Sequence, residues 1–228
     1  SNSYMFYKEQ LYRILETKIP PCFTKLCFLD ADIVFENADW YNEMSNKLND
    51  VQIAQIFSEA HWLDITYKKI LYSKLSVSFL KQGENLMGLH HTGFGFGMQR
   101  KWYKEVGFFD LAIVGGGDCL FIQSYNKCIN QDYTKIFNLN EPNYFKYTKK
   151  LIASSPKLSC ISGNVYHLYH GLIENRQFLT RNIILKSRNI TNILDILVKN
   201  DDGLYEFKDS EINDEVYQYF RKRDDDSL

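Results

Sequence analysis

The sequence lacks long apolar runs and has no excess of charge of either sign. Its longest apolar stretches, such as the one that ends at Leu29, are far shorter than the roughly 20 residues that a helix needs to cross a bilayer. The N-terminus has no charged segment followed by an apolar one, so it lacks the layout of a secretory signal. Lys and Arg number 27 against 28 Asp and Glu, so no overall field attracts nucleic acid or an anionic membrane. We therefore expect no membrane span and no nucleic-acid partner.

Paired cysteines are also missing. The cysteines are odd in number and contain no Cys-x-x-Cys pair, which argues against both a zinc ribbon and a disulfide framework. They are Cys22, Cys27, Cys119, Cys128 and Cys160. This pattern suits a reducing compartment, and we expect a cytoplasmic protein.

What is present is enough apolar material for a folded domain. Hydrophobic residues make up 45% of the 228 residues and aromatic residues 15%, whereas disordered chains lack the apolar surface that offsets chain entropy. A chain of this length forms roughly one or two domains. We predict one domain over residues 1–185 and a C-terminal tail, helical and polar, over residues 186–228.

Strand and helix patterns alternate along the chain, which predicts an α/β fold. Residues 25–35 read Lys-Leu-Cys-Phe-Leu-Asp-Ala-Asp-Ile-Val-Phe, an apolar run typical of a buried strand with acids at its end. We interpret residues 64–80 as helical. The remaining predicted strands are 51–57, 90–98 and 159–166, and the remaining helices are 4–16, 40–48, 100–106 and 119–128.

Asp30 and Asp32 close the first apolar run. Alternation along a strand points both side chains the same way, at the sheet edge where open α/β folds bind ligands. Two carboxylates on one side repel unless a cation or proton lies between them, and oxygen ligands suit Mg²⁺ or Mn²⁺ rather than zinc. We predict a divalent cation site with open positions for phosphate oxygens. The alternative is that both acids cap the following segment.

A second polar group follows the last predicted strand, in the sequence His167-Leu168-Tyr169-His170-Gly171. Imidazole nitrogen can complete the shell of Mn²⁺, so one of the two histidines is expected to join the carboxylates. Gly171 and Arg176 would let backbone and guanidinium groups approach a diphosphate. The alternative for either histidine, taken alone, is a structural role.

Three glycines precede an acid in the sequence Gly115-Gly116-Gly117-Asp118. No Lys-Ser or Lys-Thr follows them, and the pattern Gly-x-Gly-x-x-Gly is not satisfied, so this is not a phosphate-binding loop of either kind. Glycines around one acid favour close approach of a substrate to a carboxylate that accepts a proton, the role of a general base. The alternative is a tight turn followed by an Asp that caps a helix.

These motifs, in this order, resemble the A-type glycosyltransferase (GT-A) fold, and within it the group similar to glycosyltransferase family 2 in the nucleotide-diphospho-sugar transferase superfamily. Residues 28–33, with Asp30-Ala31-Asp32, are similar to the Asp-x-Asp element of the family. Residues 91–97 are similar to its His-Pro-Gly-Tyr-Ala-Trp-Ala segment, with Thr92 where proline is usual. Residues 107–110 and 115–118 resemble its Gly-Gly-x-x-Asp and Gly-Ser-Gly-Asp pair, and residues 167–171 resemble its His-Leu-Trp-His-Gly element.

The resemblance implies a fold and a reaction. The fold would be a Rossmann-like GT-A mixed sheet flanked by helices, here without part of the N-terminal unit that binds the nucleotide. The reaction would be metal-dependent transfer of a sugar from a nucleotide-diphosphate donor, with a UDP-sugar expected, to a hydroxyl of a carbohydrate or protein acceptor. Residues 1–185 would be the catalytic domain, and the chain would work within a longer polypeptide or a homo-oligomer.

The resemblance also implies roles for individual residues. Asp32 would bind the metal (Mn²⁺ or Mg²⁺) directly, Asp30 would reach the metal or the ribose, and His167 would be the third ligand. Asp118 would be the catalytic acid on the acceptor side. The donor would be bound by Lys8, Asp30, His170, Gly171 and Arg176, and the acceptor by His91, Gly93, Gly116 and Gly117.

Two rival interpretations stay open at the level of sequence. Asp30-Ala31-Asp32-Ile33-Val34 also resembles the nucleophile motif of haloacid-dehalogenase phosphatases, in which Asp30 would attack phosphorus and Asp32 would act as acid and base. That family requires a later Gly-Asp with a second acid a few residues on, whereas Asp118 is followed by Cys-Leu-Phe-Ile-Gln. The second rival is a non-catalytic module that binds nucleotide sugars without turnover.

Overall fold

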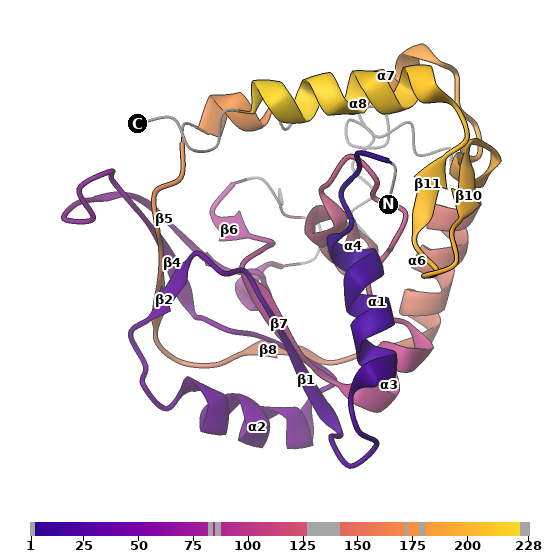
Figure 1. Cartoon of the computed structure of the whole chain (residues 1–228). Coiled ribbons are helices and arrows are strands. Elements are labelled where there is room, and N and C mark those ends of the chain that lie inside the picture. Colours follow the sequence, from indigo (N-terminus) through magenta and orange to yellow (C-terminus); the bar gives the residue numbers. More distant parts are fainter. Residues whose placement is uncertain are drawn as a thin grey trace.

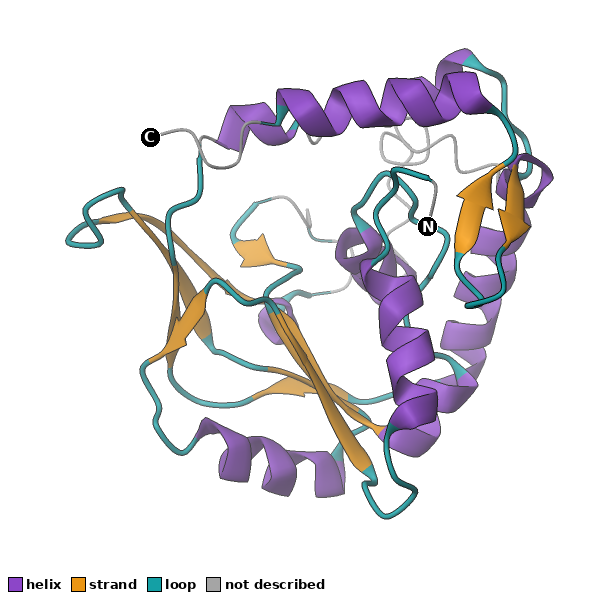
Figure 2. Cartoon of the chain, in the orientation of Figure 1, coloured by secondary structure: helices purple, strands orange, loops and turns teal. Residues whose placement is uncertain are grey.

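The computed structural model of the chain describes residues 3–81, 84, 88–126, 142–171, 173–177 and 181–223. It contains two larger sheets, and helices lie on several sides of them (Figure 1 and Figure 2). The first sheet has the strand order β1-β7-β3-β8, in which β3 and β8 are parallel and the other neighbours antiparallel. Its strands are β1 (Lys25–Leu29), β7 (Gly95–Gln99), β3 (Ile53–Gln55) and β8 (Leu158–Cys160).

The second sheet is also mixed and has the order β2-β9-β4-β5-β6. Its parallel pairs are β4 with β9 and β5 with β6, and its antiparallel pairs are β2 with β9 and β4 with β5. Its strands are β2 (Ile33–Phe35), β9 (Asn164–His167), β4 (Glu59–Leu63), β5 (Ile70–Ser76) and β6 (His90–His91). A separate antiparallel pair is formed by β10 (Leu197–Lys199) and β11 (Tyr205–Phe207).

Seven helices occur in the described part of the chain, and together with the mixed sheets they confirm the predicted α/β class. They are α1 (Lys8–Lys18), α2 (Trp40–Asp50), α3 (Arg100–Glu105), α4 (Gly117–Asn126), α6 (Pro142–Ser154), α7 (Ile183–Ser187) and α8 (Ser210–Lys222). The predicted helix 119–128 thus begins two residues earlier, at Gly117, and its predicted end lies outside the described residues.

Helices cover both faces of the first sheet. On one face α2 packs closely on β7, because Gly97 has no side chain: a Cβ there would lie 2.2 Å from Met44 Sδ. On the other face the ring of Phe28 packs against Tyr12 of α1, with ring centroids 4.6 Å apart. The missing side chain at Gly97 therefore allows a helix to pack closely against the sheet.

The chain crosses between the two larger sheets at residues 30–32, 56–58, 92–94 and 161–163. The predicted strands 25–35, 90–98 and 159–166 are therefore wrong as single elements, since each divides into two strands in different sheets. In residues 25–35, apolar residues stand on both sides of the crossing, so their pattern does not show where one strand ends and the next begins. Asp30 and Asp32 lie in such a crossing, outside any strand, so the argument from strand alternation does not apply to them.

The helix predicted at residues 64–80 is also wrong. Residues 59–76 form the β4–β5 hairpin, followed by a single 3-10 turn at Val77–Phe79. The turn between β4 and β5 is fixed by Asp64, whose carboxylate accepts hydrogen bonds from the backbone N–H groups of Lys68 and Lys69 at 3.0 and 3.1 Å. Tyr67 adopts a φ of 58° within it. A local side-chain-to-backbone turn has thus replaced the helical alternative.

The first helix covers Lys8–Lys18 instead of the predicted residues 4–16, and it presents a different face to the core. Leu11 and Leu15 are exposed, whereas Glu9, Gln10 and Glu16 are buried. Two of these polar groups have distant partners. Gln10 Oε1 accepts the backbone N–H of Tyr205, and Glu16 pairs with Arg100 at 2.6 Å. These long-range contacts determine which face of the helix is buried. The spacing of apolar residues along the helix gives no information about such contacts.

The C-terminal residues are part of the core and not a peripheral tail. Leu197, Phe207, Ile212 and Val216 are buried in the same hydrophobic cluster as Phe121 of α4. Helix α8 lies across one side of the molecule in Figure 1. Their apolar residues are spaced among charged ones, which is why the segment reads as polar.

Two absences concern the described residues only. None of their helices has the length and apolarity needed to cross a membrane. Cys22, Cys27, Cys119 and Cys160 are free thiols, and Cys128 lies outside the described residues.

Gln55 joins the two sheets through four hydrogen bonds. Its side-chain Nε2 donates to the carbonyl oxygens of His91 and Gly93 at 2.9 and 3.1 Å. Its Oε1 accepts from Ser76 Oγ at 2.8 Å and from the backbone N–H of Val77 at 2.9 Å. The amide is fully buried and all its hydrogen-bonding capacity is used. Gln55 therefore holds the crossing at residues 92–94 in place.

Replacing Gln55 should destabilise the fold strongly. Gln55→Leu leaves several buried polar groups unpaired, and we expect the free energy of unfolding to fall by about 3 kcal/mol or more. The matched control is Gln99→Leu, which removes one hydrogen bond, to Leu48 O, and should cost about 1 kcal/mol. Urea denaturation measures both. Equal losses in the two variants would contradict the role given to Gln55.

Candidate functional site

A carboxylate and two imidazoles meet where β2 pairs with β9. Asp32 Oδ2 lies 3.3 Å from His167 Nε2 and 2.7 Å from His170 Nε2, and the two imidazole nitrogens are 3.0 Å apart. The β2–β9 register pairs Ile33 with His167, and the backbone N–H of Leu168 donates to Asp32 O at 2.8 Å. Backbone pairing thus brings residues far apart in sequence into one group.

This group has the ligand atoms of a metal site. One atom from each of Asp32, His167 and His170 lies within 4.8 Å of the others. Asp32 Oδ1 is buried and has no hydrogen-bond partner among the described residues. Burial alone would raise the pKa of Asp32, but hydrogen bonds from both histidines outweigh it and hold the pKa well below its usual value. An ionised carboxylate with a spare buried oxygen beside two imidazoles suits Mn²⁺ better than Mg²⁺, which prefers oxygen ligands.

Arg176 adds a permanent positive charge to the group. Its Nη2 lies 2.6 Å from His170 Nδ1, and its backbone oxygen accepts the Tyr219 hydroxyl at 3.2 Å. Gly171 has a φ of 83°, which turns the chain between the histidines and Arg176. A guanidinium beside a candidate metal group is an arrangement that receives phosphate oxygens.

Asp30 does not join this group. Its carboxylate forms an ion pair with Lys8 of α1, and both side chains are about one-third exposed. Burial alone would lower the pKa of Lys8, but Asp30 and Asp118 raise it above its usual value. The structure therefore places the predicted donor-binding Lys8 and the predicted ligand Asp30 against each other, beside the metal group but outside it.

Asp118 lies in the first turn of α4, and two glycines make room for carboxylates. The backbone N–H of Cys119 donates to Asp118 Oδ1 at 2.8 Å. Asp118 Oδ2 lies where a side chain on Gly93 would be, 2.6 Å from its ideal Cβ. In the same way Glu9 Oε1 lies 2.3 Å from an ideal Cβ on Gly117. Both glycines, predicted to admit an acceptor, admit acidic side chains of the chain itself.

The other two predicted acceptor residues have different surroundings. Gly116 has a φ of 88°, which the turn before α4 requires. The ring of His91 packs between Phe94 and Trp62, with centroid distances of 4.1 and 4.7 Å. Burial lowers the pKa of His91 to about 3, so the imidazole is neutral, and its buried Nε2 has no partner among the described residues.

The segment 91–94 connects Asp118 to the metal group. Gly93 lies against the Asp118 carboxylate, and the ring of the next residue, Phe94, stacks on His167 at 4.6 Å with an interplanar angle of 14°. The Phe94 carbonyl also accepts the backbone N–H of Asp30 at 2.9 Å. A single short crossing therefore separates a candidate base from a candidate metal centre.

Sequence reasoning missed two parts of this site. Glu9 is only 5% exposed, and burial raises its pKa to about 7. No sequence signal marks it, because the apolar periodicity of the helix assigns its face to solvent. Trp62 and Tyr72 of the β4–β5 hairpin stack on each other with ring centroids 4.6 Å apart, and the Trp62 ring lies 5.9 Å from the His167 ring. A strand predicted over residues 59–63 would have indicated that Trp62 lies on a sheet and can contact residues of a neighbouring strand.

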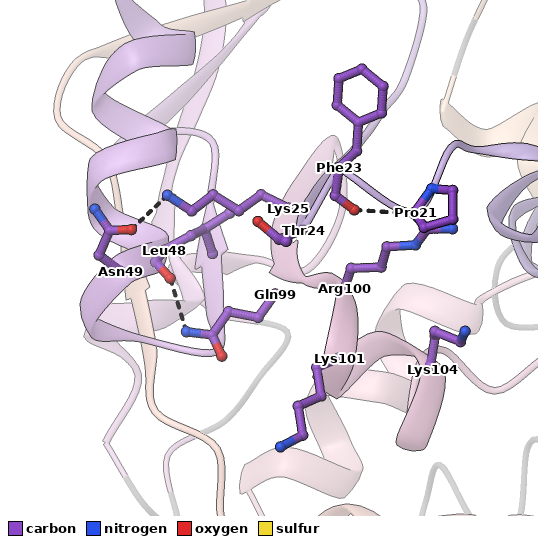
Figure 3. Close-up of a pocket in the computed structure, with 10 residues that line it drawn as sticks. All are labelled: Pro21, Phe23, Thr24, Lys25, Leu48, Asn49, Gln99, Arg100, Lys101 and Lys104. Atoms are coloured by element: carbon purple, nitrogen blue, oxygen red, sulfur yellow. Dashed lines mark hydrogen bonds between the residues drawn. The ribbon is translucent and has the colours of Figure 1, made fainter.

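Two cavities lie in different places. One of about 20 Å³, lined by Lys8, Glu9, Tyr12 and Asp118 together with aromatic residues, has room for about one water molecule. A larger one of about 560 Å³ opens between the α1–β1 loop, the end of α2 and the start of α3 (Figure 3). Its lining includes no predicted site residue.

The larger cavity is basic, but its best-placed cations already have partners. Lys25 Nζ donates to Asn49 Oδ1 at 2.6 Å, and Arg100 Nε donates to Glu16 Oε1 at 2.6 Å (Figure 3 shows the first of these). The larger cavity therefore lies apart from the residues that could bind a metal or transfer a proton.

Comparison with protein-family models, with curated proteins and with solved structures finds no match to this chain.

The buried Glu9 predicts an unusual pH dependence of stability. Native Glu9 keeps its proton up to about pH 7, whereas an unfolded Glu loses it near pH 4.5, so the native state binds more protons in this window. Stability from this residue is therefore lost as pH rises, by about 3 kcal/mol between the two values. Glu9→Gln removes that loss and should gain relative stability from about pH 5 to pH 8.

Urea denaturation across this pH range measures the difference, with the exposed Glu105→Gln as the matched control. Wild type and Glu9→Gln should diverge with pH while wild type and the control stay parallel. Parallel curves for all three proteins would show that Glu9 ionises normally.

Proposed function

We propose that the chain is a metal-dependent glycosyltransferase that moves a sugar from a nucleoside-diphosphate donor to an acceptor hydroxyl. The observation that carries this proposal is the group of Asp32, His167 and His170, in which a buried carboxylate oxygen has no partner among the described residues. The motif resemblance to the GT-A fold supports it, since all three residues stand in motifs of that family.

The donor would be bound through its diphosphate. Asp32, His167 and His170 would hold Mn²⁺ or Mg²⁺, which would offset the negative charge that builds on the departing diphosphate. Arg176 contacts His170 through its guanidinium group and would bind a phosphate oxygen of the donor. A UDP-sugar is the expected donor.

The acceptor hydroxyl would be deprotonated by Asp118. Its Oδ1 accepts the backbone N–H of Cys119, and its Oδ2, which the Thr92 hydroxyl approaches at 3.5 Å, would accept the proton. Lys8 lies near this carboxylate and near Asp30, and the two acids raise the pKa of Lys8 above its usual value. The segment 91–94 would set the spacing between acceptor and donor.

The phosphatase alternative requires Asp30 and Asp32 to act on the same phosphate. In the structure Asp30 is paired with Lys8, whereas Asp32 is paired with His167 and His170. Separate partners give the two carboxylates separate tasks, which favours the glycosyltransferase proposal.

The metal group predicts metal-dependent nucleotide binding. Wild type should bind UDP at least about tenfold more tightly with Mn²⁺ than without it, and Asp32→Ala should lose this gain because it removes a ligand. Isothermal titration calorimetry measures both, with the exposed Asp50→Ala as the matched control. Undiminished Mn²⁺ dependence in Asp32→Ala would refute the site.

Asp118 predicts a separation of binding from turnover. Asp118→Asn should keep the Mn²⁺-dependent affinity for UDP, while UDP release from a panel of UDP-sugars falls by about 10² to 10⁴-fold. An unchanged rate would exclude Asp118 as the base. Metal-dependent binding with no turnover of any nucleotide sugar in wild type would favour the non-catalytic module.

A further inference from the structure

The β4–β5 hairpin carries an exposed apolar tip. Ile65, Tyr67, Ile70 and Leu71 are 46%, 54%, 50% and 57% exposed. Figure 1 and Figure 2 show the hairpin extending from the body of the molecule, with the turn at its far end. Clustered apolar side chains on a projecting element mark an interaction surface rather than ordinary surface composition.

The tip is held in one conformation before it meets a partner. Asp64 accepts hydrogen bonds from the Thr66 hydroxyl at 2.9 Å and from the backbone N–H groups of Lys68 and Lys69. These bonds meet the charge of Asp64 within the turn and fix Tyr67 in its left-handed backbone conformation. The apolar side chains are therefore presented outward by a preorganised turn.

Positive charge accompanies the apolar side chains. Lys68 and Lys69 are exposed at the same tip, directly between Tyr67 and Ile70. Apolar side chains, a tyrosine and lysines together match the layered chemistry of an anionic bilayer surface, where the apolar groups enter and the lysines meet the headgroups. Stable peripheral binding takes two such signals, apolar insertion and basic charge. The chain as a whole has a net charge of -1, so any attraction to anionic lipids would come from the lysines of the tip.

We propose that the hairpin tip, residues 64–72, docks the protein on the surface of a bilayer that contains anionic lipids. A projecting tip favours this partner over a protein, because a stable protein interface buries roughly 800 Å² on each side over complementary surfaces. A bilayer receives a narrow tip without a matching groove.

Docking by this tip would place the metal group near the bilayer. Trp62, at the end of β4 next to the turn, has its ring 5.9 Å from that of His167, and Tyr72 of β5 stacks on Trp62. The same two strands thus join the tip to the site. It follows, on the basis of the proposed function, that the acceptor is presented at a membrane surface. The docking itself does not depend on that function.

Vesicle sedimentation tests the proposal, with phosphatidylcholine vesicles that either contain or lack phosphatidylglycerol. Wild type should sediment with the anionic vesicles, and the doubly substituted Ile70→Ser, Leu71→Ser should bind at least about tenfold less. The matched control is Leu11→Ser, Leu15→Ser on α1, whose leucines are 42% and 56% exposed, and it should bind like wild type. Lys68→Gln, Lys69→Gln should weaken binding and reduce its dependence on salt.

Absence of wild-type sedimentation, or equal binding by the tip and α1 variants, would overturn the proposal. Self-association that is lost on changing the tip, in the absence of vesicle binding, would overturn it in favour of a second copy of the chain. Circular dichroism melts show whether each variant is folded. Asp32→Ala should bind vesicles like wild type, so failure of the docking proposal and failure of the metal site are separate outcomes.

Discussion

The antiparallel pairing of β2 with β9 is the constraint on which the candidate site depends. Its register places His167 opposite Ile33, the residue after Asp32, and the hydrogen bond from Leu168 to Asp32 extends the pairing by one step. The carboxylate then meets His167 through backbone pairing, and the loop after β9 brings His170 to the same carboxylate. A one-residue slip would move His167 to the other face of the sheet and remove it from Asp32. The sheet pairing therefore fixes the Asp32–His167 half of the site.

A second constraint links this group to Asp118. The chain crosses between the sheets at residues 92–94, and Gln55 fixes that crossing through the carbonyl groups of His91 and Gly93. One side of the crossing is filled by the Asp118 carboxylate and the other by the Phe94–His167 stack. Absent side chains are as important here as present ones, because Gly93 and Gly117 leave space that two carboxylates occupy. Glu9 is buried, Asp118 is half-buried, and the Lys8 ammonium lies near both acids.

The sequence was informative where function and structure are local. The α/β class follows from alternating patterns, and the expectation that one of His167 and His170 meets a carboxylate follows from their position after a strand. That both histidines meet Asp32, and that Asp30 does not join them, was not predicted. The division of residues 25–35 between two sheets could not be predicted, because an apolar run has the same pattern whether it enters one sheet or two. Glu9 was hidden for a related reason: Gln10 and Glu16 find partners in distant segments, which turns the helix against its own apolar periodicity. The hairpin at residues 59–76 depends on Asp64 closing a turn, a local feature that a helical reading of 64–80 overlooks.

Asp32, His167 and His170 are proposed to bind a metal through one carboxylate and two imidazole nitrogens. Detection of those nitrogens as ligands is the direct test of this proposal. Pulsed electron paramagnetic resonance of the Mn²⁺ complex detects nitrogen nuclei bonded to the metal. We expect a clear ¹⁴N modulation in wild type that is reduced in His170→Ala and lost when His167 is also replaced by Ala. A Mn²⁺ complex without nitrogen modulation, or one that both substitutions leave unchanged, would contradict it.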